Sequence, residues 1–306
     1  MKKEITLLLL FLTSGFISFA QQEAHYTQYM YNMSIVNPAY MINKPGLIEV
    51  GSLYRMQWTG IDGAPRTANV FANIPLSENL EISANFLNDH IGESSTINFN
   101  TFNTDIAYKV RLNENLNLSA GLKIGFDSFN LNFSDQLLTD PSFENKKDAK
   151  FKIGAGLFLF AEQFYVGLSA PNFSGSKIEV EYNDQSVYSS KTHFFLMGGY
   201  IFKAGDNFKI KPSTIVKQTS GAPLTFDLSL NTLFADRFEL GASYRYQESV
   251  AFLTSIFVTR DLRLGYAYDL NTGNLKEYTG GSHEFLLTYT FDVVGLGKKY
   301  ASPRFY

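Results

Sequence analysis

Residues 54–75, YRMQWTGIDGAPRTANVFANIP, decide the fold of this chain because they join two alternating stretches through one tight loop. On both sides of the loop, apolar side chains alternate with charged or amide side chains such as Arg55 and Asn69. The loop itself, Thr59–Pro65, contains Gly for positive φ and Pro for a fixed φ. This two-faced hairpin is typical of a membrane barrel wall with a polar lumen. It is equally typical of a soluble β-sandwich with one face in water, so the hairpin alone leaves both open.

The start of the chain predicts export from the cytoplasm. Met1-Lys2-Lys3 is positively charged, Ile5–Phe19 is almost wholly apolar, and small residues precede Gln21. This is the pattern of a secretory signal peptide at residues 1–20, cleaved after Ala20. The chain contains no Cys, which excludes disulfides, thiol catalysis and Cys-ligated metals.

The composition of the remaining chain predicts an all-β protein. Aromatic residues make up 15% of the chain, with 28 Phe and 18 Tyr, and no later stretch has the apolar length of a spanning helix. Helical periodicity is missing, whereas alternation with a period of two is frequent. The formal net charge of −3 argues against a nucleic-acid-binding surface.

From Gly46 onward, period-two alternation predicts about 14 antiparallel strands. The pattern slips near Asn100, and Pro212 lies within another strand; both predict β-bulges. Short connections are expected at one end of the strands: Leu76–Asn79, Arg111–Asn115, Glu162–Gln163, Ala204–Asn207, Ala235–Arg237 and Arg260–Asp261. Longer ones are expected at the other end: Asn88–Ser95, Asp127–Lys150, Pro171–Lys191 and Asn271–Ser282. This sorting favours a transmembrane β-barrel over a sandwich, and an even strand count places both termini on the periplasmic side.

The N-terminal segment at residues 21–45 lacks strict alternation and is rich in Tyr and Met. We interpret it as an irregular segment that plugs the lumen, the alternative being a frayed leader. The predicted lumen face carries both signs of charge: Glu49, Arg55, Glu81, Lys123, Lys152, Lys209, Lys211, Asp227, Glu239, Arg245, Arg263 and Asp269. Mixed charge favours a filled lumen over a charge-selective pore. The predicted organisation is a signal peptide (1–20), the N-terminal segment (21–45), the barrel (46–292) and a periplasmic tail (293–306).

No constellation in the sequence predicts catalysis. The four His residues, at positions 25, 90, 193 and 283, show no metal-ligand spacing. Ser282, His283 and Glu284 have the residue types of a catalytic triad, but neighbouring residues on a strand point to opposite faces. The acidic residues Asp135, Asp140, Glu144 and Asp148 do not have the spacing of an EF-hand calcium loop. We therefore expect no enzyme, no cofactor and no metal site.

Several motifs resemble one protein family. Asn37-Pro38-Ala39-Tyr40 resembles the NPAY element of the PorP/SprF family of type IX secretion system membrane proteins. The run Tyr54-Arg55-x-Gln57-Trp58-x-Gly60-x-x-Gly63-Ala64-Pro65-x-Thr67 is similar to that family's YRxQWxGxxGAPxT signature. Shorter matches are Gly265-Tyr266-Ala267-Tyr268-Asp269, Gly281-Ser282-His283-Glu284 and the final Ser302-Pro303-Arg304-Phe305-Tyr306. The resemblance runs collinearly through the mature chain.

This resemblance implies a component of the outer membrane of a Gram-negative bacterium that serves type IX secretion or gliding motility. It implies binding and retention of a secreted surface adhesin with a type B C-terminal domain, and contact with other type IX machinery and outer-membrane lipid. The alternative is a passive channel for small or hydrophobic solutes. The motif residues are candidates for partner contact or for a structural role: Asn37, Pro38, Ala39, Tyr40, Tyr54, Arg55, Gln57, Trp58, Gly60, Gly63, Ala64, Pro65, Thr67, Gly265, Tyr266, Tyr268, Asp269, Ser282, His283 and Glu284.

Overall fold

The computed structural model describes residues 26–93, 95–133, 145–173, 192–205, 207–219 and 223–292, with the backbone of 181–182 and 185–186. The predicted signal peptide, the predicted tail and the acidic residues Asp135, Asp140 and Glu144 lie outside these residues. In the described part of the chain, the helical turns are two 3-10 turns, η1 (Tyr29–Tyr31) and η2 (Met33–Ile35). No helix there is long and apolar enough to cross a membrane.

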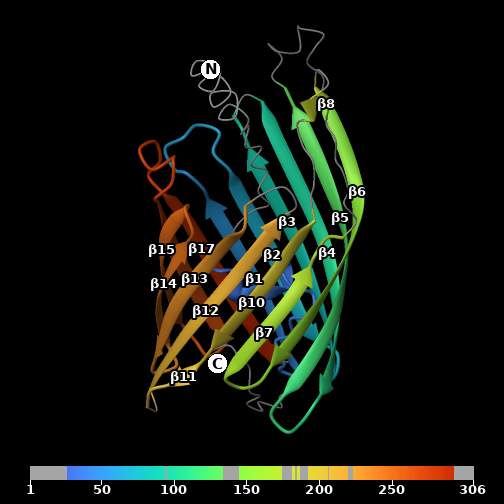
Figure 1. The fold of residues 1–306 in the computed structure, drawn as a ribbon, viewed down its shortest axis with the longest axis vertical. Helices are drawn as coiled ribbons and strands as arrows, with labels where there is room; N and C mark the ends of the chain where they lie inside the picture. The colour runs from blue at the N-terminus through green and yellow to red at the C-terminus, as the bar shows by residue number, and fades with distance from the viewer. Residues whose placement is uncertain are drawn as a thin grey trace, which may run out of the picture.

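The alternating segments form a closed barrel of 14 antiparallel strands (Figure 1), which confirms the predicted fold class. The strands are β1 (Leu47–Met56), β2 (Arg66–Pro75), β3 (Leu80–Ile91), β4 (Thr96–Arg111), β5 (Asn117–Asn132), β6 (Lys146–Phe160), β7 (Phe164–Ala170), β10 (His193–Tyr200) continued by β11 (Phe202–Lys203), β12 (Phe208–Thr219), β13 (Thr225–Phe234), β14 (Phe238–Arg245), β15 (Ser249–Phe257), β16 (Leu262–Asn271) and β17 (Ser282–Asp292). Each strand pairs with its neighbour along the chain, and β1 pairs with β17 to close the wall. A separate two-strand ladder joins β8 (Glu181–Tyr182) to β9 (Gln185–Ser186).

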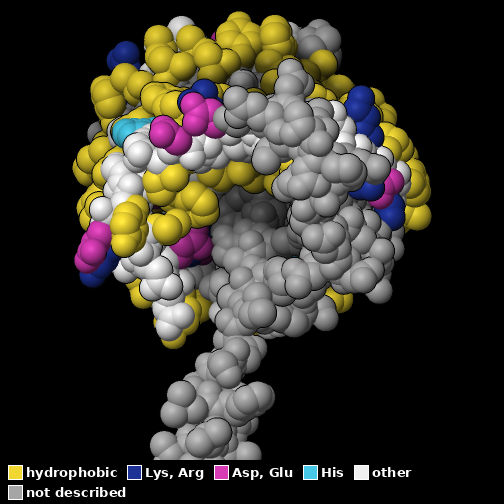
Figure 2. Space-filling view, turned by 90° about the horizontal axis from the view of Figure 1, so that it is seen from above, with side chains coloured by type: hydrophobic (Ala, Val, Ile, Leu, Met, Phe, Trp, Pro, Cys, Tyr) yellow, Lys and Arg dark blue, Asp and Glu magenta, His cyan; other side chains and the backbone are white. Residues whose placement is uncertain are grey.

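The wall is apolar outside, whereas its inward face combines polar and charged side chains with buried apolar ones such as Leu53, Phe71 and Phe158. On β2, outward Val70 is 55% exposed, whereas its inward neighbour Asn69 is buried. On β5, outward Leu122 is 57% exposed and inward Lys123 only 1%. Apolar side chains cover the outside of the wall when the barrel is seen from above (Figure 2). This inverts the pattern of a soluble protein and suits a wall that contacts lipid.

The longer connections, 57–65, 133–145, 171–192 and 272–281, all lie at one end of the barrel, together with three short ones. The other end carries the turns at 76–79, 112–116, 161–163, 204–207, 235–237 and 258–261. We call this the short-turn end. The opposite, long-loop end carries the connections at 57–65, 92–95, 133–145, 171–192, 220–224, 246–248 and 272–281.

The two predicted bulges are wrong. β4 pairs with β5 over its whole length and with β3 from Ile97 to Tyr108, each in one unbroken register that includes Asn100. The pattern changes there because the outward face becomes polar, while inward Ile97 and Phe99 pack with Phe129 and Leu131. At Pro212, the register of β12 is also constant, and the ladder to the preceding strand is instead interrupted opposite this residue. Proline has no N–H to donate there.

The loop predicted at Asp127–Lys150 is shorter than expected, because the strands on both sides of it continue past the apolar band. β5 continues to Asn132, and β6 begins at Lys146. Inward Phe129 and Leu131 keep the alternation going, so β4, β5 and β6 extend beyond the apolar band toward the long-loop end.

Two arginine substitutions on the outward face of β4 test where this band ends. Ile106→Arg is expected to lower stability by about 2–4 kcal/mol, because a charge enters hydrocarbon, and Asn98→Arg by about 1 kcal/mol or less. Urea unfolding in lipid vesicles measures both. Equal losses in the two variants would contradict this position of the band.

Candidate functional site

The lumen is occupied by the described part of the N-terminal segment, Tyr26–Pro45, which we call the plug segment. Almost all of its side chains from Tyr26 to Ile42 are buried. It runs inside the wall, behind β7 and β10 in Figure 1. Its hydrogen bonds reach inward side chains on both halves of the barrel, from Glu284 and Glu239 to Asn69. The plug segment therefore fills the lumen, which confirms the predicted fold class of a barrel with an irregular N-terminal segment inside it.

The first anchor of the plug segment is a buried ionic cluster. Arg55 on β1 contacts Asp269 on β16 at 2.6 Å and Glu284 on β17 at 3.0 Å. The Glu284 carboxylate also accepts the backbone N–H groups of Thr27 and Gln28, at 2.9 and 2.7 Å. The Thr27 hydroxyl donates to Asp269 at 2.7 Å and accepts from Arg55 at 3.1 Å. Three motifs that are far apart in sequence thus meet at one point of the plug segment.

A second anchor lies on the β13–β16 side of the lumen. The Tyr31 hydroxyl donates to Glu239 at 2.7 Å. Glu239 is paired with Arg263, whose guanidinium also lies over the Tyr31 ring, 3.8 Å from its centroid. Asn231 donates to Glu239 at 2.7 Å. Burial of this pair is tolerable because each charged group is both paired and hydrogen-bonded.

A third anchor lies on the β2–β5 side. The Asn32 amide donates to both Asn69 and Asn85 at 2.9 Å. Lys123 donates to the Ser34 carbonyl at 2.8 Å and pairs with Asp105 at 3.1 Å. The plug segment therefore supplies hydrogen-bond partners to Asn69, Asn85 and Lys123 on this side of the lumen.

The NPAY turn sits on a wall made of glycines. The Asn37 amide accepts from Ala39 N–H at 2.9 Å and donates to the Leu157 carbonyl at 3.1 Å. A Cβ on Gly121 would lie 2.2 Å from the Pro38 carbonyl oxygen, and one on Gly156 2.1 Å from Asn37 Oδ1. The turn therefore approaches the backbone of β5 and β6 as only glycine permits.

The plug segment leaves the lumen at the short-turn end. Glu81 on β3 accepts the N–H of Ile42 at 2.8 Å. Lys109 on β4 donates to the Asn43 side chain at 2.5 Å. Tyr40, just before this exit, packs edge-on against Phe158, with ring centroids 5.6 Å apart. These contacts fix the direction in which the chain enters β1.

The loop of the YRxQW signature forms a platform at the long-loop end. Trp58 has φ +47° and donates its N–H to Ser282 Oγ at 3.2 Å. Thr59 exchanges backbone hydrogen bonds with the 272–281 loop, at 2.8 and 2.7 Å. Gly63, with φ +72°, packs on Gly92 and accepts its N–H at 2.9 Å. Positive φ explains the glycine at position 63, because side chains with a Cβ rarely adopt it, whereas Trp58 adopts it despite its Cβ.

The remaining motif residues do not gather at one site: they make local contacts or lie on the outward face. The backbone N–H of Gln57 donates to the Pro65 carbonyl, and the backbone N–H of Ala64 donates to the Ile61 carbonyl. The Thr67 hydroxyl donates to Asp89 at 2.6 Å. Gly60 has φ +94°, and Gly265 lies against Gln28, where a Cβ would come within 2.6 Å. Tyr54, Tyr266, Tyr268 and His283 lie on the outward face, where Tyr266 OH is 2.8 Å from His283 Nδ1. Ser282 and His283 thus face opposite sides of the wall and form no triad.

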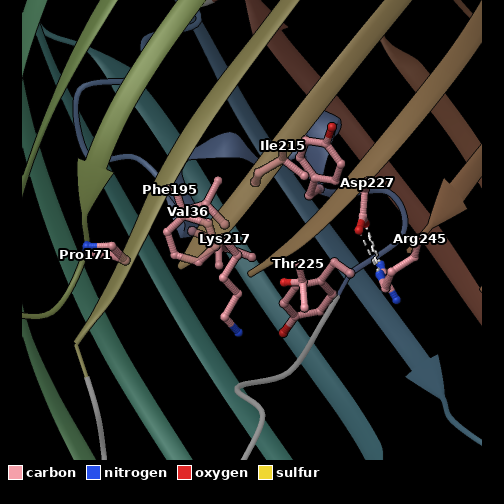
Figure 3. Close-up of a pocket in the computed structure, with 11 residues that line it drawn as sticks. Val36, Pro171, Phe195, Ile215, Lys217, Thr225, Asp227 and Arg245 are labelled. Atoms are coloured by element: carbon pink, nitrogen blue, oxygen red, sulfur yellow. Dashed lines mark hydrogen bonds and ion pairs between the residues drawn. The ribbon is translucent and has the colours of Figure 1, made fainter. Parts of the chain in front are cut away.

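A small cavity of about 80 Å³ remains beside the plug segment, toward the long-loop end (Figure 3). Tyr26, Tyr29 and Val36 of the plug segment and Phe195 of β10 give it an apolar lining. Arg245, at its edge, holds both oxygens of Asp227 at 3.1 and 3.0 Å. The cavity is therefore mainly apolar, with charged side chains at Lys217 and at the Asp227–Arg245 pair.

The sequence matches the family model of the type IX secretion system membrane protein PorP/SprF over residues 18–289. The chain belongs to this family. Comparison with curated proteins gave no match. Among solved structures, it is similar to the Ralstonia pickettii toluene transporter TbuX (TM-score 0.52, 7% identity, 84% of this chain and 92% of that one). It is also similar to the Pseudomonas putida toluene transporter TodX (TM-score 0.51, 10% identity, 88% and 95%).

The PorP/SprF chain therefore has the fold of an outer-membrane barrel, and at these low identities the likeness extends to the fold alone. Its family is one of secretion-associated membrane proteins. Sequence reasoning named Arg55, Asp269 and Glu284 separately and missed their partners Thr27 and Gln28. It also missed the glycine seat of the NPAY turn. Inward glycines on β5, at positions 121 and 125, and on β6, at positions 154 and 156, were the available signal.

Proposed function

We propose that this chain binds a type IX-secreted surface protein, an adhesin with a type B C-terminal domain, and retains it at the outer membrane. The observation that carries this proposal is the filled lumen: the plug segment bonds to side chains on both halves of the wall. A filled barrel suits a binding platform better than a pore. Family membership supports a role in secretion, and contact with other type IX machinery fits the same role.

The proposed orientation places the long-loop end outside the cell. Both Leu47 and Asp292, the ends of the barrel, lie at the short-turn end, which would face the periplasm. Short periplasmic turns and longer outside loops are usual in outer-membrane barrels. The connections we expect to contact the adhesin, 133–145 and 171–192, lie largely outside the described residues. Binding residues are disproportionately found on such loops.

A pull-down from outer membranes in mild detergent tests the proposal. We expect a large secreted protein to be recovered with the tagged chain at near equal amounts. Replacing residues 134–144 and 174–190 by short Gly-Ser linkers leaves all barrel strands intact and is expected to release that protein into the medium. A matched replacement of the short turn 113–115 serves as the control. Unchanged surface display with both loops shortened, or recovery of periplasmic machinery alone, would contradict adhesin retention.

The second candidate function is a passive channel for small or hydrophobic solutes. The apolar cavity beside Tyr29 and Phe195 favours it. This function requires the plug segment to move. Conductance or solute uptake by the purified, unaltered chain would support the channel and weaken the platform.

A further inference from the structure

The lipid-facing wall over β5, β6 and β7 contains a groove of about 600 Å³. Three of its outward side chains are small, namely Ala120, Ala155 and Ala170. Aromatic side chains Tyr108, Phe173 and Phe194 border it. The volume falls within the range of small-molecule sites, about 300–1,000 Å³.

The floor of this groove is bare backbone. Gly121, Gly156 and Ser169 line it although they belong to the inward face of the wall. On that inward face, Gly121 and Gly156 meet the NPAY turn, and the Ser169 hydroxyl donates to the Val36 carbonyl at 2.6 Å. The groove and the plug segment therefore lie back to back, separated by one layer of main chain.

The groove ends where β7 ends. β7 pairs with β6 only as far as Ala170 and with β10 only as far as Ser169. Beyond that point, the N–H of Phe173 bonds to the Ile153 carbonyl at 2.7 Å, so the chain bridges to β6 without continuing the β7 strand. Because β7 ends early, the groove also ends there, and Phe173 and Phe194 border that end of the groove.

We propose that this groove is a binding site for a single long apolar chain, the acyl chain of an outer-membrane lipid. The groove lies in the apolar outward band, beside Leu122 and Leu168, so hydrocarbon is the medium that it meets. Its lining is almost wholly apolar and offers no cluster of polar groups for a headgroup or a peptide.

A membrane protein partner fits the groove less well than an acyl chain. The strands beneath it are paired on both sides along the floor, β5 with β6 and β6 with β7, so no free strand edge is available there for sheet extension. A trough whose floor is main chain matches a flexible chain, which can follow the floor and gain van der Waals contacts with it; inside the bilayer such packing, not removal from water, drives association. Because the NPAY turn rests on the same main chain, a bound acyl chain would stiffen the wall that seats the plug segment. This site is independent of the proposed adhesin contact.

Photo-crosslinking tests the groove directly. The full chain is placed in phosphatidylethanolamine and phosphatidylglycerol vesicles that contain a trace of phospholipid with a diazirine on one acyl chain, and the labelled residues are mapped by mass spectrometry. We expect several-fold more label on the groove residues of β5–β7 than on equally exposed Leu228, Leu230 and Leu240 of β13 and β14. Ala155→Phe, which fills the groove, is expected to reduce its label to the level of those leucines.

Ala242→Phe is the matched control, because Ala242 is a small outward residue of β14 away from the groove. It is expected to leave the groove label unchanged. Even labelling around the whole band of the unaltered chain would mean annular lipid only and would overturn the proposal. So would a folded Ala155→Phe variant that keeps its groove label.

Discussion

Arg55→Ala is expected to destabilise the barrel by about 3–5 kcal/mol, because it leaves two buried carboxylates without their cation. Asp269 and Glu284 are both almost fully buried, and both lie within 3.0 Å of Arg55. The same change removes the hydrogen bond from Arg55 to Thr27, so the first turn of the plug segment loosens with it. Urea unfolding in vesicles gives the free energy, and limited proteolysis reports exposure of the plug segment.

Two further variants separate the ionic cluster from a general effect of substitution. Tyr54→Ala changes the neighbouring outward side chain, which contacts lipid rather than the lumen, and is expected to cost much less than Arg55→Ala. The triple variant Arg55→Met, Asp269→Asn, Glu284→Gln removes every charge of the cluster. It is expected to recover most of the lost stability, since no carboxylate of the cluster is then left buried without its cation. Equal unfolding midpoints for Arg55→Ala and Tyr54→Ala would show that the cluster does not hold the plug segment.

The wall of the barrel could be predicted from the sequence because its pattern is local. Alternation in a strand has a period of two, so Val70 and Asn69 reveal their faces without knowledge of any partner strand. The inward direction of Arg55, Asp269 and Glu284 followed from the same rule. Their meeting at one point did not, since it depends on the closure of β1 against β17 and on the register between β16 and β17.

The contents of the lumen could be predicted only in outline. Thr27 and Gln28 contact Glu284 and Asp269 mainly through their backbone N–H groups and one hydroxyl. Because almost every residue has a backbone N–H group, the residue types do not predict such contacts. The bulge expected near Asn100 failed for a different reason. A strand that leaves the membrane changes the polarity of its outward face without changing its phase, and the two effects look alike in a sequence.

Gly121→Ala is expected to unseat the NPAY turn while the barrel still assembles. A Cβ at this position would lie 2.2 Å from the Pro38 carbonyl oxygen, which belongs to the backbone and cannot rotate away. The strand itself tolerates alanine, because β5 keeps its full ladders with β4 and β6. The turn must therefore move into the lumen. We expect new ion conductance in planar bilayers and cleavage of the plug segment by protease, neither of which the unaltered chain should show.

Gly198→Ala provides the matched control, since a Cβ there would lie 3.4 Å from the nearest atom, an ordinary contact. This variant also replaces a strand glycine by alanine, on β10, and should stay closed and resist protease. A Gly121→Ala barrel that stays closed would mean that the wall, rather than the plug segment, yields to the new methyl group. If Gly121→Ala conducts and still captures the adhesin, partner binding does not require a seated plug segment. If capture is lost together with closure, the plug segment supports the outer surface that the adhesin recognises.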